Sequence, residues 1–182
     1  VKNTEPVPEH DPIPVADETS IAPLSTVSTG TAADSDGSVI DLLVVYTPAV
    51  ESLYGSEGND ALIILAVAET NQAYINSNMT TRVNLAGVYR TNYIESGDML
   101  TDLTRLRTPN DGFMDEVHAV RNIYGADIVS LIEASGNACG IAYLMNNLST
   151  NFASHAFNVV HHSCATGYYS FAHEIGHNQG AA

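Results

Sequence analysis

Two histidines and a glutamate near the end of the sequence have the spacing of a metal site. His173, Glu174 and His177 form the pattern His-Glu-x-x-His. On a helix, residues four apart lie on the same face, so both imidazoles can reach one ion. The pair predicts zinc, a redox-inert Lewis acid that binds nitrogen ligands and keeps a position open for water. Glu174 is then the candidate general base, taking a proton from metal-activated water as it attacks a peptide carbonyl.

The simpler interpretation of these three residues is a helix with two incidental histidines and a surface glutamate. The surrounding sequence argues against it, because the pattern falls in a helix expected to begin near Ser170 and Gly180 follows the second histidine by three residues. A glycine can end a helix in a left-handed turn, which would bring the chain back to offer a third ligand. Gly180 is therefore predicted to have a structural role.

Composition excludes several classes of protein. The 182 residues suit one domain with a hydrophobic core. The chain has 21 acidic residues against 6 basic ones, and a net charge of −15, so nucleic acid and anionic membranes should repel it. The longest apolar run, residues 61–68, is too short to span a bilayer, so no membrane insertion is expected. The chain opens with Val1, which suggests a segment whose leader has been removed.

Two cysteines, Cys139 and Cys164, allow two interpretations. An even count suits one disulfide in an oxidising compartment, whereas a cytosolic protein would keep both as buried thiols. The disulfide is favoured, and it indicates a secreted, extracellular protein. Closing a loop of about 25 residues would contribute roughly 3 kcal/mol to stability.

Residues 1–37 differ in composition from the rest of the chain. They hold five of the seven prolines and no aromatic residue, so they cannot bury enough apolar surface to offset the entropy of ordering. We therefore expect a disordered linker or a remnant of a pro-segment. His10 or Asp11 could in principle reach the metal and keep the site latent, but a solvated linker is the simpler hypothesis. The catalytic domain is then residues 38–182.

From residue 38 onward, hydrophobic patterns predict alternating strands and helices. The apolar run at 39–47 is typical of a central strand. Residues 59–76 have Ile64, Val67 and Ile75 at helical spacing, which would be the core face, with Asn59 or Asp60 as the cap. The remaining predicted elements are strands at 81–89, 127–132, 140–145 and 154–161, and helices at 98–106, at 111–124 ending at Gly125, and from about 170. This order predicts an α/β fold with helices packed on a mixed sheet.

The metal motif and its surroundings resemble a known family. The pattern His-Glu-x-x-His-x-x-Gly matches the metzincin signature up to its final histidine, which would follow Ala182. The segment HEIGHNQG is similar to the reprolysin-like, or adamalysin-like, branch. The stretch 39–182 resembles the bacterial secreted peptidyl-Asp metalloendopeptidases, through VIDLLVVYTP, LAVAETNQAYINS, YGADIVSLI, CGIAYLMN and CATGYYSFAHEIGHNQGAA.

The resemblance implies a zinc endopeptidase that acts on protein or peptide substrates. Its fold would be a mostly parallel sheet with one antiparallel edge strand, in an N-terminal subdomain joined to an active-site helix. His173 and His177 would bind Zn²⁺, with Glu174 as the base. The third ligand and a methionine-containing turn would lie beyond Ala182, so residues 1–182 alone should bind zinc poorly and be inactive.

The resemblance also implies how substrate is bound. An extended substrate would pair with the edge strand through Gly140, Ile141, Ala142 and Tyr143. A Cys139–Cys164 disulfide would fix that strand to the loop that enters the motif helix. Cleavage on the amino side of aspartate is the implied specificity.

Alternative hypotheses concern the function and the other histidines. The chain could be a catalytically inert, protease-derived binding or adhesion module, which an apolar residue after Ala182 would favour. A third ligand supplied by a distant glutamate, as in another clan of zinc peptidases, is disfavoured by Gly180. His161 and His162 lie near Cys164 but fit the edge of a strand better than a second metal site, and His118 is expected to be solvated.

Overall fold

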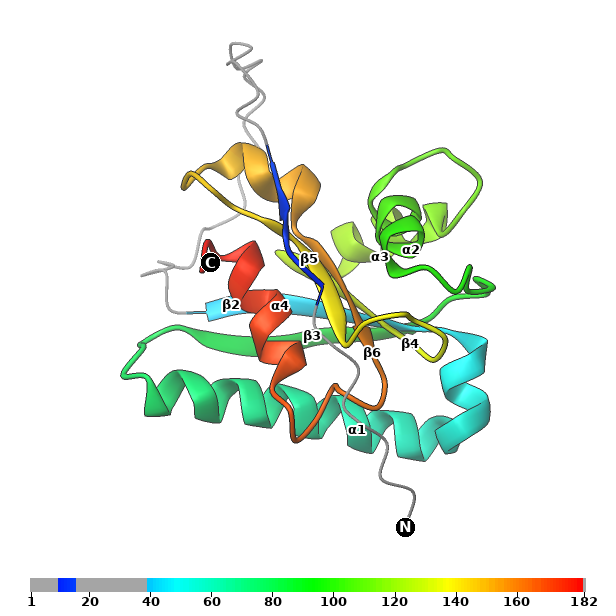
Figure 1. Ribbon diagram of the computed structural model, residues 1–182, viewed down its shortest axis with the longest axis horizontal. Coiled ribbons are helices and arrows are strands. Elements are labelled where there is room, and N and C mark those ends of the chain that lie inside the picture. The colour runs from blue at the N-terminus through cyan, green and yellow to red at the C-terminus, as the bar shows by residue number, and fades with distance from the viewer. Residues whose placement is uncertain (1–9, 16–38, 182) are drawn as a thin grey trace.

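The fold is built on a six-stranded sheet, seen in a computed structural model that describes residues 10–15 and 39–181 (Figure 1). The strand order is β1-β5-β6-β4-β2-β3. Four strands run parallel: β2 (Val39–Tyr46), β3 (Arg82–Arg90), β4 (Ile128–Glu133) and β6 (Phe157–His161). β5 (Gly140–Leu144) is antiparallel to β6. The predicted α/β fold, with a mostly parallel sheet that contains one antiparallel pair, is confirmed. The predicted edge position of β5 was wrong, because β1 pairs with its outer side.

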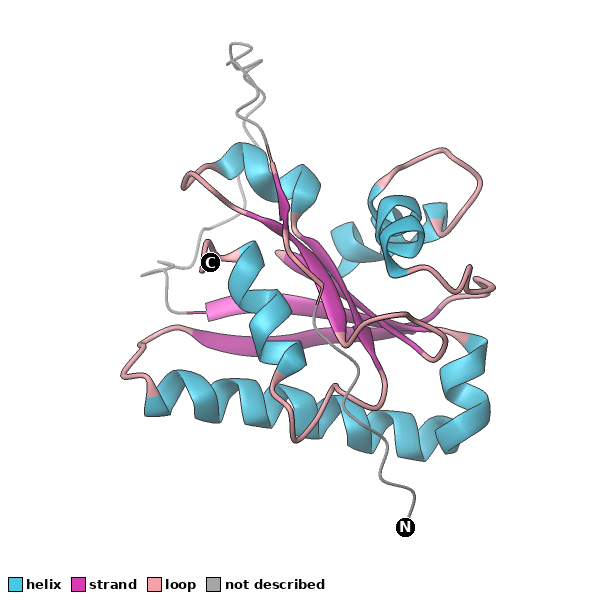
Figure 2. Cartoon of the chain, viewed as in Figure 1, coloured by secondary structure: helices cyan, strands magenta, loops and turns pink. Residues whose placement is uncertain are grey.

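Helices cover both faces of the sheet (Figure 2). α1 (Pro48–Asn76) and α4 (Ser170–Asn178) contact each other on one face, and α2 (Met99–Arg107) and α3 (Asp115–Tyr124) lie on the other. Leu42, Leu43, Val44 and Val45 in β2 are fully buried. A strand covered on both faces needs a continuous apolar run rather than alternation, which is why this one could be recognised from sequence. Burying each such side chain stabilises the fold by roughly 1.5–3 kcal/mol.

α1 begins earlier than the sequence pattern predicted, and it buries a different face. Its first turn is capped by the Thr47 side chain, which accepts a hydrogen bond from the Val50 amide, and Gly55 (φ 68°) interrupts it. The prediction that the helix starts at residue 59 was therefore wrong. The core-face prediction was also wrong, because Ile64 and Ile75 are 61% and 50% exposed. After the interruption at Gly55, the buried positions are Asn59, Ile63, Ala66, Thr70 and Tyr74.

The shorter helices agree better with their sequence signals. The Asp98 side chain caps α2 by accepting a hydrogen bond from the Thr101 amide. Gly125 (φ 62°) ends α3 as predicted, although that helix begins at Asp115 rather than residue 111. Within α3, Val117 is fully buried and Tyr124 is exposed, and Phe113 precedes the helix and is also exposed. The predicted strand 154–161 is in fact two elements, a 3₁₀ turn (η1, Thr150–His155) followed by β6.

Part of the N-terminal region is ordered against the sheet. β1 (Ile13–Pro14) pairs in parallel with β5, joining Ile13 to Tyr143. The prediction of disorder for residues 1–37 therefore does not hold for residues 10–15, because pairing with β5 outweighs their proline-rich composition. Residues 1–9 and 16–37 of that prediction lie outside the described residues.

Within the described ranges, no helix is long and apolar enough to cross a membrane.

Candidate metal centre

The motif helix α4 packs one side against the sheet and leaves the other side open. Phe171, Glu174, Ile175 and Asn178 are buried and follow the spacing i, i+3, i+4, i+7 of a helix face. The helix begins at Ser170, as predicted, after Tyr169 in a left-handed conformation (φ 62°). His177 is almost fully buried and His173 is exposed, so the histidine pair lies at the border between the core and solvent.

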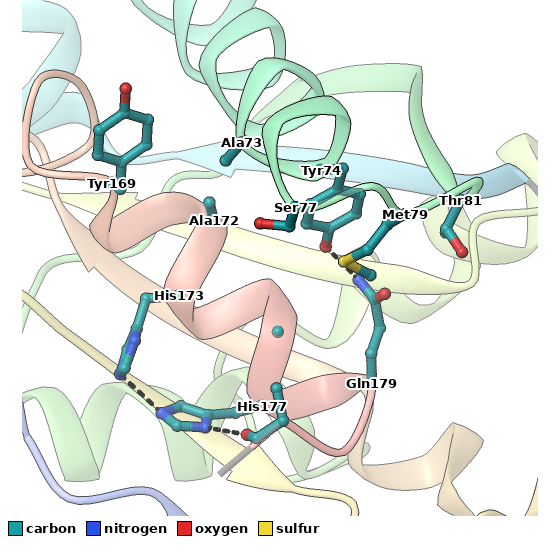
Figure 3. Close-up of a pocket in the computed structure, with 12 residues that line it drawn as sticks. Ala73, Tyr74, Ser77, Met79, Thr81, Tyr169, Ala172, His173, His177 and Gln179 are labelled. Carbon is teal, nitrogen blue, oxygen red and sulfur yellow. Dashed lines mark hydrogen bonds between the residues drawn. The ribbon is translucent and has the colours of Figure 1, made fainter.

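The two histidines converge on one point (Figure 3). Their Nε2 atoms lie 2.8 Å apart, and their ring centroids are 4.3 Å apart with an interplanar angle of 80°. The Nδ1 atom of His177 is 2.7 Å from the Ala181 carbonyl oxygen. A proton on Nδ1, donated to this carbonyl, leaves the Nε2 lone pair free to bind a metal, and such backbone partners are typical of metal-binding histidines.

Gly180 makes the contact between His177 and Ala181 possible. Its φ of 93° is the left-handed conformation predicted for a glycine ending this helix. The Gly180 amide donates to the His177 carbonyl, and the Ala181 amide donates to the Gly176 carbonyl. These hydrogen bonds close the turn and direct the Ala181 carbonyl back toward the ring of His177.

Glu174 is fully buried and lies against the first residue of β5. An ideal Cβ built on Gly140 would be 2.5 Å from Oε1 of Glu174 and 2.6 Å from its Cγ. The carboxylate therefore occupies space that any other residue at position 140 would fill. Gly140, which the family resemblance placed in the substrate strand, therefore also packs directly against the motif helix.

The predicted substrate strand has its outer side occupied. Gly140, Ile141, Ala142 and Tyr143 are all buried. The His10 amide donates to the Gly140 carbonyl at 3.1 Å, and the Asn146 side chain donates to the Val15 carbonyl. In the described residues, segment 10–15 thus lies where the sequence led us to expect an extended substrate.

Asn178, which was not predicted from the sequence, anchors the end of the motif helix to the sheet. Its Nδ2 donates to the Tyr143 carbonyl at 2.9 Å and to the Phe157 carbonyl at 3.2 Å. Its Oδ1 accepts from Nδ2 of Asn158 at 2.9 Å, and Asn158 in turn bonds Ser130. The signal was available, since a polar residue on the same stripe as Phe171 and Ile175 needs buried partners.

The disulfide joins the two segments that lead into the site. Cys139 and Cys164 have an S–S distance of 1.99 Å, and Cys139 directly precedes β5. The amide of His161 donates to the Cys139 carbonyl. The start of β5 is therefore held both covalently and by its neighbouring strand.

A pocket of about 560 Å³ opens beside the histidine pair. It is bordered by α4 and by the end of α1, where Tyr74 accepts a hydrogen bond from Gln179 at 2.5 Å (Figure 3). Burial raises the pKa of Tyr74 above its ordinary value. Tyr74 therefore lines this pocket as a neutral hydroxyl at physiological pH.

Other titratable groups lie outside this centre. Burial, followed by the nearby Asp102 carboxylate, raises the pKa of Glu133 to about 9. The expectation that His118 is solvated was wrong, since it packs against Phe157 and burial lowers its pKa. Nδ1 of His162 lies 2.8 Å from the Tyr54 hydroxyl oxygen.

In residues 10–15 and 39–181, no group of three or more His, Cys, Asp or Glu side chains is placed to hold a metal ion.

Comparisons with known proteins agree with the motif. Residues 61–182 match the family described as metallo-peptidase family M12B, reprolysin-like. The chain is 46% identical over 170 residues to a peptidyl-Asp metalloendopeptidase of Stenotrophomonas maltophilia strain K279a, covering 93% of this chain and 38% of that protein. It is 44% identical over 156 residues to the peptidyl-Asp metalloendopeptidase of Xanthomonas campestris pv. campestris, covering 85% and 36%. The chain thus spans little more than a third of the length of these relatives.

A solved structure has a similar fold. A chain in the structure titled "Structure of a chaperone-substrate complex" superposes with a TM-score of 0.64 and 25% identity. The match covers 79% of this chain and 26% of that chain.

Proposed function

The chain belongs to the reprolysin-like M12B metallopeptidase family, and on that premise we propose that it carries the metal-binding helix of a zinc endopeptidase that cuts protein substrates. The observation that supports this most strongly is the convergence of two histidine Nε2 atoms 2.8 Å apart. Two nitrogen ligands of one tetrahedral zinc lie roughly 3.3 Å apart, so a small opening of this pair would accommodate the ion. The contact between Nδ1 of His177 and Ala181 favours the tautomer that a metal needs.

The third ligand is proposed to follow Ala182. Family membership implies a divalent metal, and His173 and His177 are proposed as two of its ligands because their Nε2 atoms converge. The Gly180 turn supports a third ligand from the next part of the chain, because it already reverses the backbone toward His177. A metzincin histidine at that position would complete the set.

Glu174 is proposed to be the general base. When bound, zinc lowers the pKa of water and polarises a peptide carbonyl. Glu174 would accept the proton of the attacking water and deliver it to the leaving amine. Its burial on a rigid helix, against Gly140, restricts the positions that its carboxylate can take. A fixed carboxylate favours one productive geometry for proton transfer.

β5 is proposed to bind the substrate backbone. A peptide could add to the sheet beside Gly140–Leu144, with main-chain hydrogen bonds giving affinity. Residues 10–15 now pair with that edge, so substrate binding would require them to leave. The relatives' names make cleavage beside aspartate the specificity to test.

The wider assignments follow from the same family. We propose residues 38–182 as part of the catalytic domain and the region before it as a linker or pro-segment remnant. The Cys139–Cys164 disulfide supports an extracellular location, because disulfides persist in oxidising compartments.

The test is peptide cleavage by the protein extended past Ala182 to its natural end, which is called the full-length protein below. A mixed peptide library is incubated with the wild-type protein, with and without a chelator, and with the Glu174→Ala variant, and mass spectrometry identifies the cut bonds. Cleavage that needs both the metal and Glu174, with aspartate following the cut, is the expected result. A folded, zinc-loaded protein that cuts nothing, with and without residues 1–37, would instead favour an inert binding module.

A further inference from the structure

Gly140, the first residue of β5, faces Glu174 of the motif helix with no room for a side chain between them. A Cβ on Gly140 would lie 2.5 Å from Oε1, 2.6 Å from Cγ and 2.8 Å from Cδ of Glu174. Real Cβ atoms essentially never come this close to other heavy atoms. We propose that Gly140 is a positioning residue for catalysis, whose missing side chain forms the space that holds the Glu174 carboxylate. This inference rests on the proposed role of Glu174 as the base.

The strand side of this space is fixed. Gly140 pairs with Val160 in the antiparallel ladder, and the His161 amide donates to the Cys139 carbonyl at 2.9 Å. Cys139 is joined covalently to Cys164. The backbone at Gly140 therefore cannot move away from the helix without breaking ladder hydrogen bonds or straining the disulfide.

The helix side is fixed at the other end of β5. The Met145 amide donates to the His177 carbonyl at 3.0 Å, and Nδ2 of Asn178 donates to the Tyr143 carbonyl at 2.9 Å. These bonds set the distance between α4 and β5 one turn after Glu174. Because neither backbone can move easily, an added methyl group must displace the most adjustable part, which is the Glu174 side chain.

The displacement should affect catalysis more than folding or metal binding. The three atoms nearest to a Cβ on Gly140 all belong to Glu174, so His173 and His177 keep their mutual geometry if only Glu174 moves. A carboxylate shifted by about 1 Å is expected to lower kcat roughly 100-fold. KM should change little, because β5 keeps its backbone groups.

The experiment compares Gly140→Ala with Asn122→Ala, a change at an exposed position of α3 on the other face of the sheet. The control adds no atom near β5 or the motif helix. Crystal structures of the metal-free wild type and both variants locate the Glu174 carboxylate, and kcat and KM are measured on the zinc-loaded, full-length proteins. We expect Glu174 to move, and kcat to fall, only in Gly140→Ala.

A double-mutant cycle tests whether the two residues act together. Glu174→Asp gives a shorter carboxylate that would leave room for the methyl group added at position 140, so Gly140→Ala should lower kcat far less in that background. An unmoved Glu174 in Gly140→Ala, a moved β5 instead, or equal losses in both backgrounds would overturn the inference. So would failure of both the single and the double variant to fold, because the crowding would then involve other atoms.

The outcomes separate this inference from the proposed function. If the wild-type protein cleaves no peptide, or if Glu174→Ala retains full activity, the proposed function fails. The metal-free crystal structures still decide whether residue 140 controls the position of the Glu174 carboxylate.

Discussion

Nδ2 of Asn178 lies 2.9 Å from the carbonyl oxygen of Tyr143, and this bond joins the end of the motif helix to β5. Asn178 directly follows His177, so one residue fixes the second proposed ligand relative to the proposed substrate strand. Both Nδ2 hydrogens and Oδ1 are used inside the protein. The histidine pair is thus attached to the sheet by a polar residue with no unused donor.

Replacing Asn178 with alanine should destabilise the fold strongly. The change leaves the Tyr143 and Phe157 carbonyls and the Asn158 amide without this partner in a buried site, so the free energy of unfolding should fall by about 2–4 kcal/mol. Urea unfolding of the metal-free protein measures it. Asn76→Ala, at an exposed position, is the control and should change stability by less than about 0.5 kcal/mol. Equal effects of both variants would contradict the role given to Asn178.

Removing the disulfide should lower stability by a comparable amount. Cys139 and Cys164 are 25 residues apart, and opening a loop of that size costs about 3 kcal/mol. The double variant Cys139→Ala/Cys164→Ala should therefore melt at a lower temperature than the oxidised wild type. Wild type treated with reductant should approach the variant. If reductant shifts the variant as much as the wild type, the shift does not come from this bond.

The buried acid Glu133 should make stability depend on pH. Burial, with Asp102 nearby, raises its pKa to about 9 in the folded protein. Between its unfolded pKa and pH 9, the folded state holds a proton that the unfolded state has lost. Glu133 therefore stabilises the fold fully only below its unfolded pKa, and that contribution is lost as pH rises toward 9, by up to about 1.4 kcal/mol per pH unit.

Glu133→Gln removes this titration. Urea unfolding at pH 5 to 9 should show that the free energy of unfolding falls less steeply with pH in the variant than in the wild type. The stability of the variant relative to the wild type should therefore increase with pH. Parallel pH profiles for the two proteins would show that Glu133 ionises normally in the folded state.

Residues 10–15 should compete with substrate. His10 and Ile13 pair with the same strand that we propose binds the peptide backbone. A protein lacking residues 1–37 should have a lower KM, with kcat nearly unchanged, than one lacking only residues 1–9. Steady-state kinetics with a peptide cut by both proteins is the measurement. Identical KM values would show that this pairing does not restrict access to β5.

Sequence patterns predicted the elements that are uniformly buried or whose signals are local in the chain. β2 is buried on both faces, so Leu42 and Val45 belong to one continuous apolar run. α4 was found because its chemistry and its Gly180 turn are both local in sequence. Its fully buried Glu174 is harder to foresee, since the contact with Gly140 joins residues far apart in the chain.

Other features depended on tertiary contacts that a pattern does not contain. α1 carries apolar residues on all of its sides, so its sequence pattern did not distinguish Ile63 from Ile64 as the core residue. Packing buries only Ile63. β1 contains Pro14 and has the composition of a linker, yet it pairs with β5. The partners of Asn178 are mainly backbone carbonyls of β5 and β6, which no residue type indicates.

The most direct test of the central claim is zinc binding by the histidine pair. Zinc stoichiometry and affinity are measured by competition with a chromophoric chelator, on the full-length wild type and on His173→Ala, His177→Ala and the control His118→Ala. Wild type and the control should bind one zinc per chain at the site, and each motif variant should lose at least about 100-fold in affinity. Unchanged affinity in His173→Ala and His177→Ala would contradict the assignment of this helix as the metal centre.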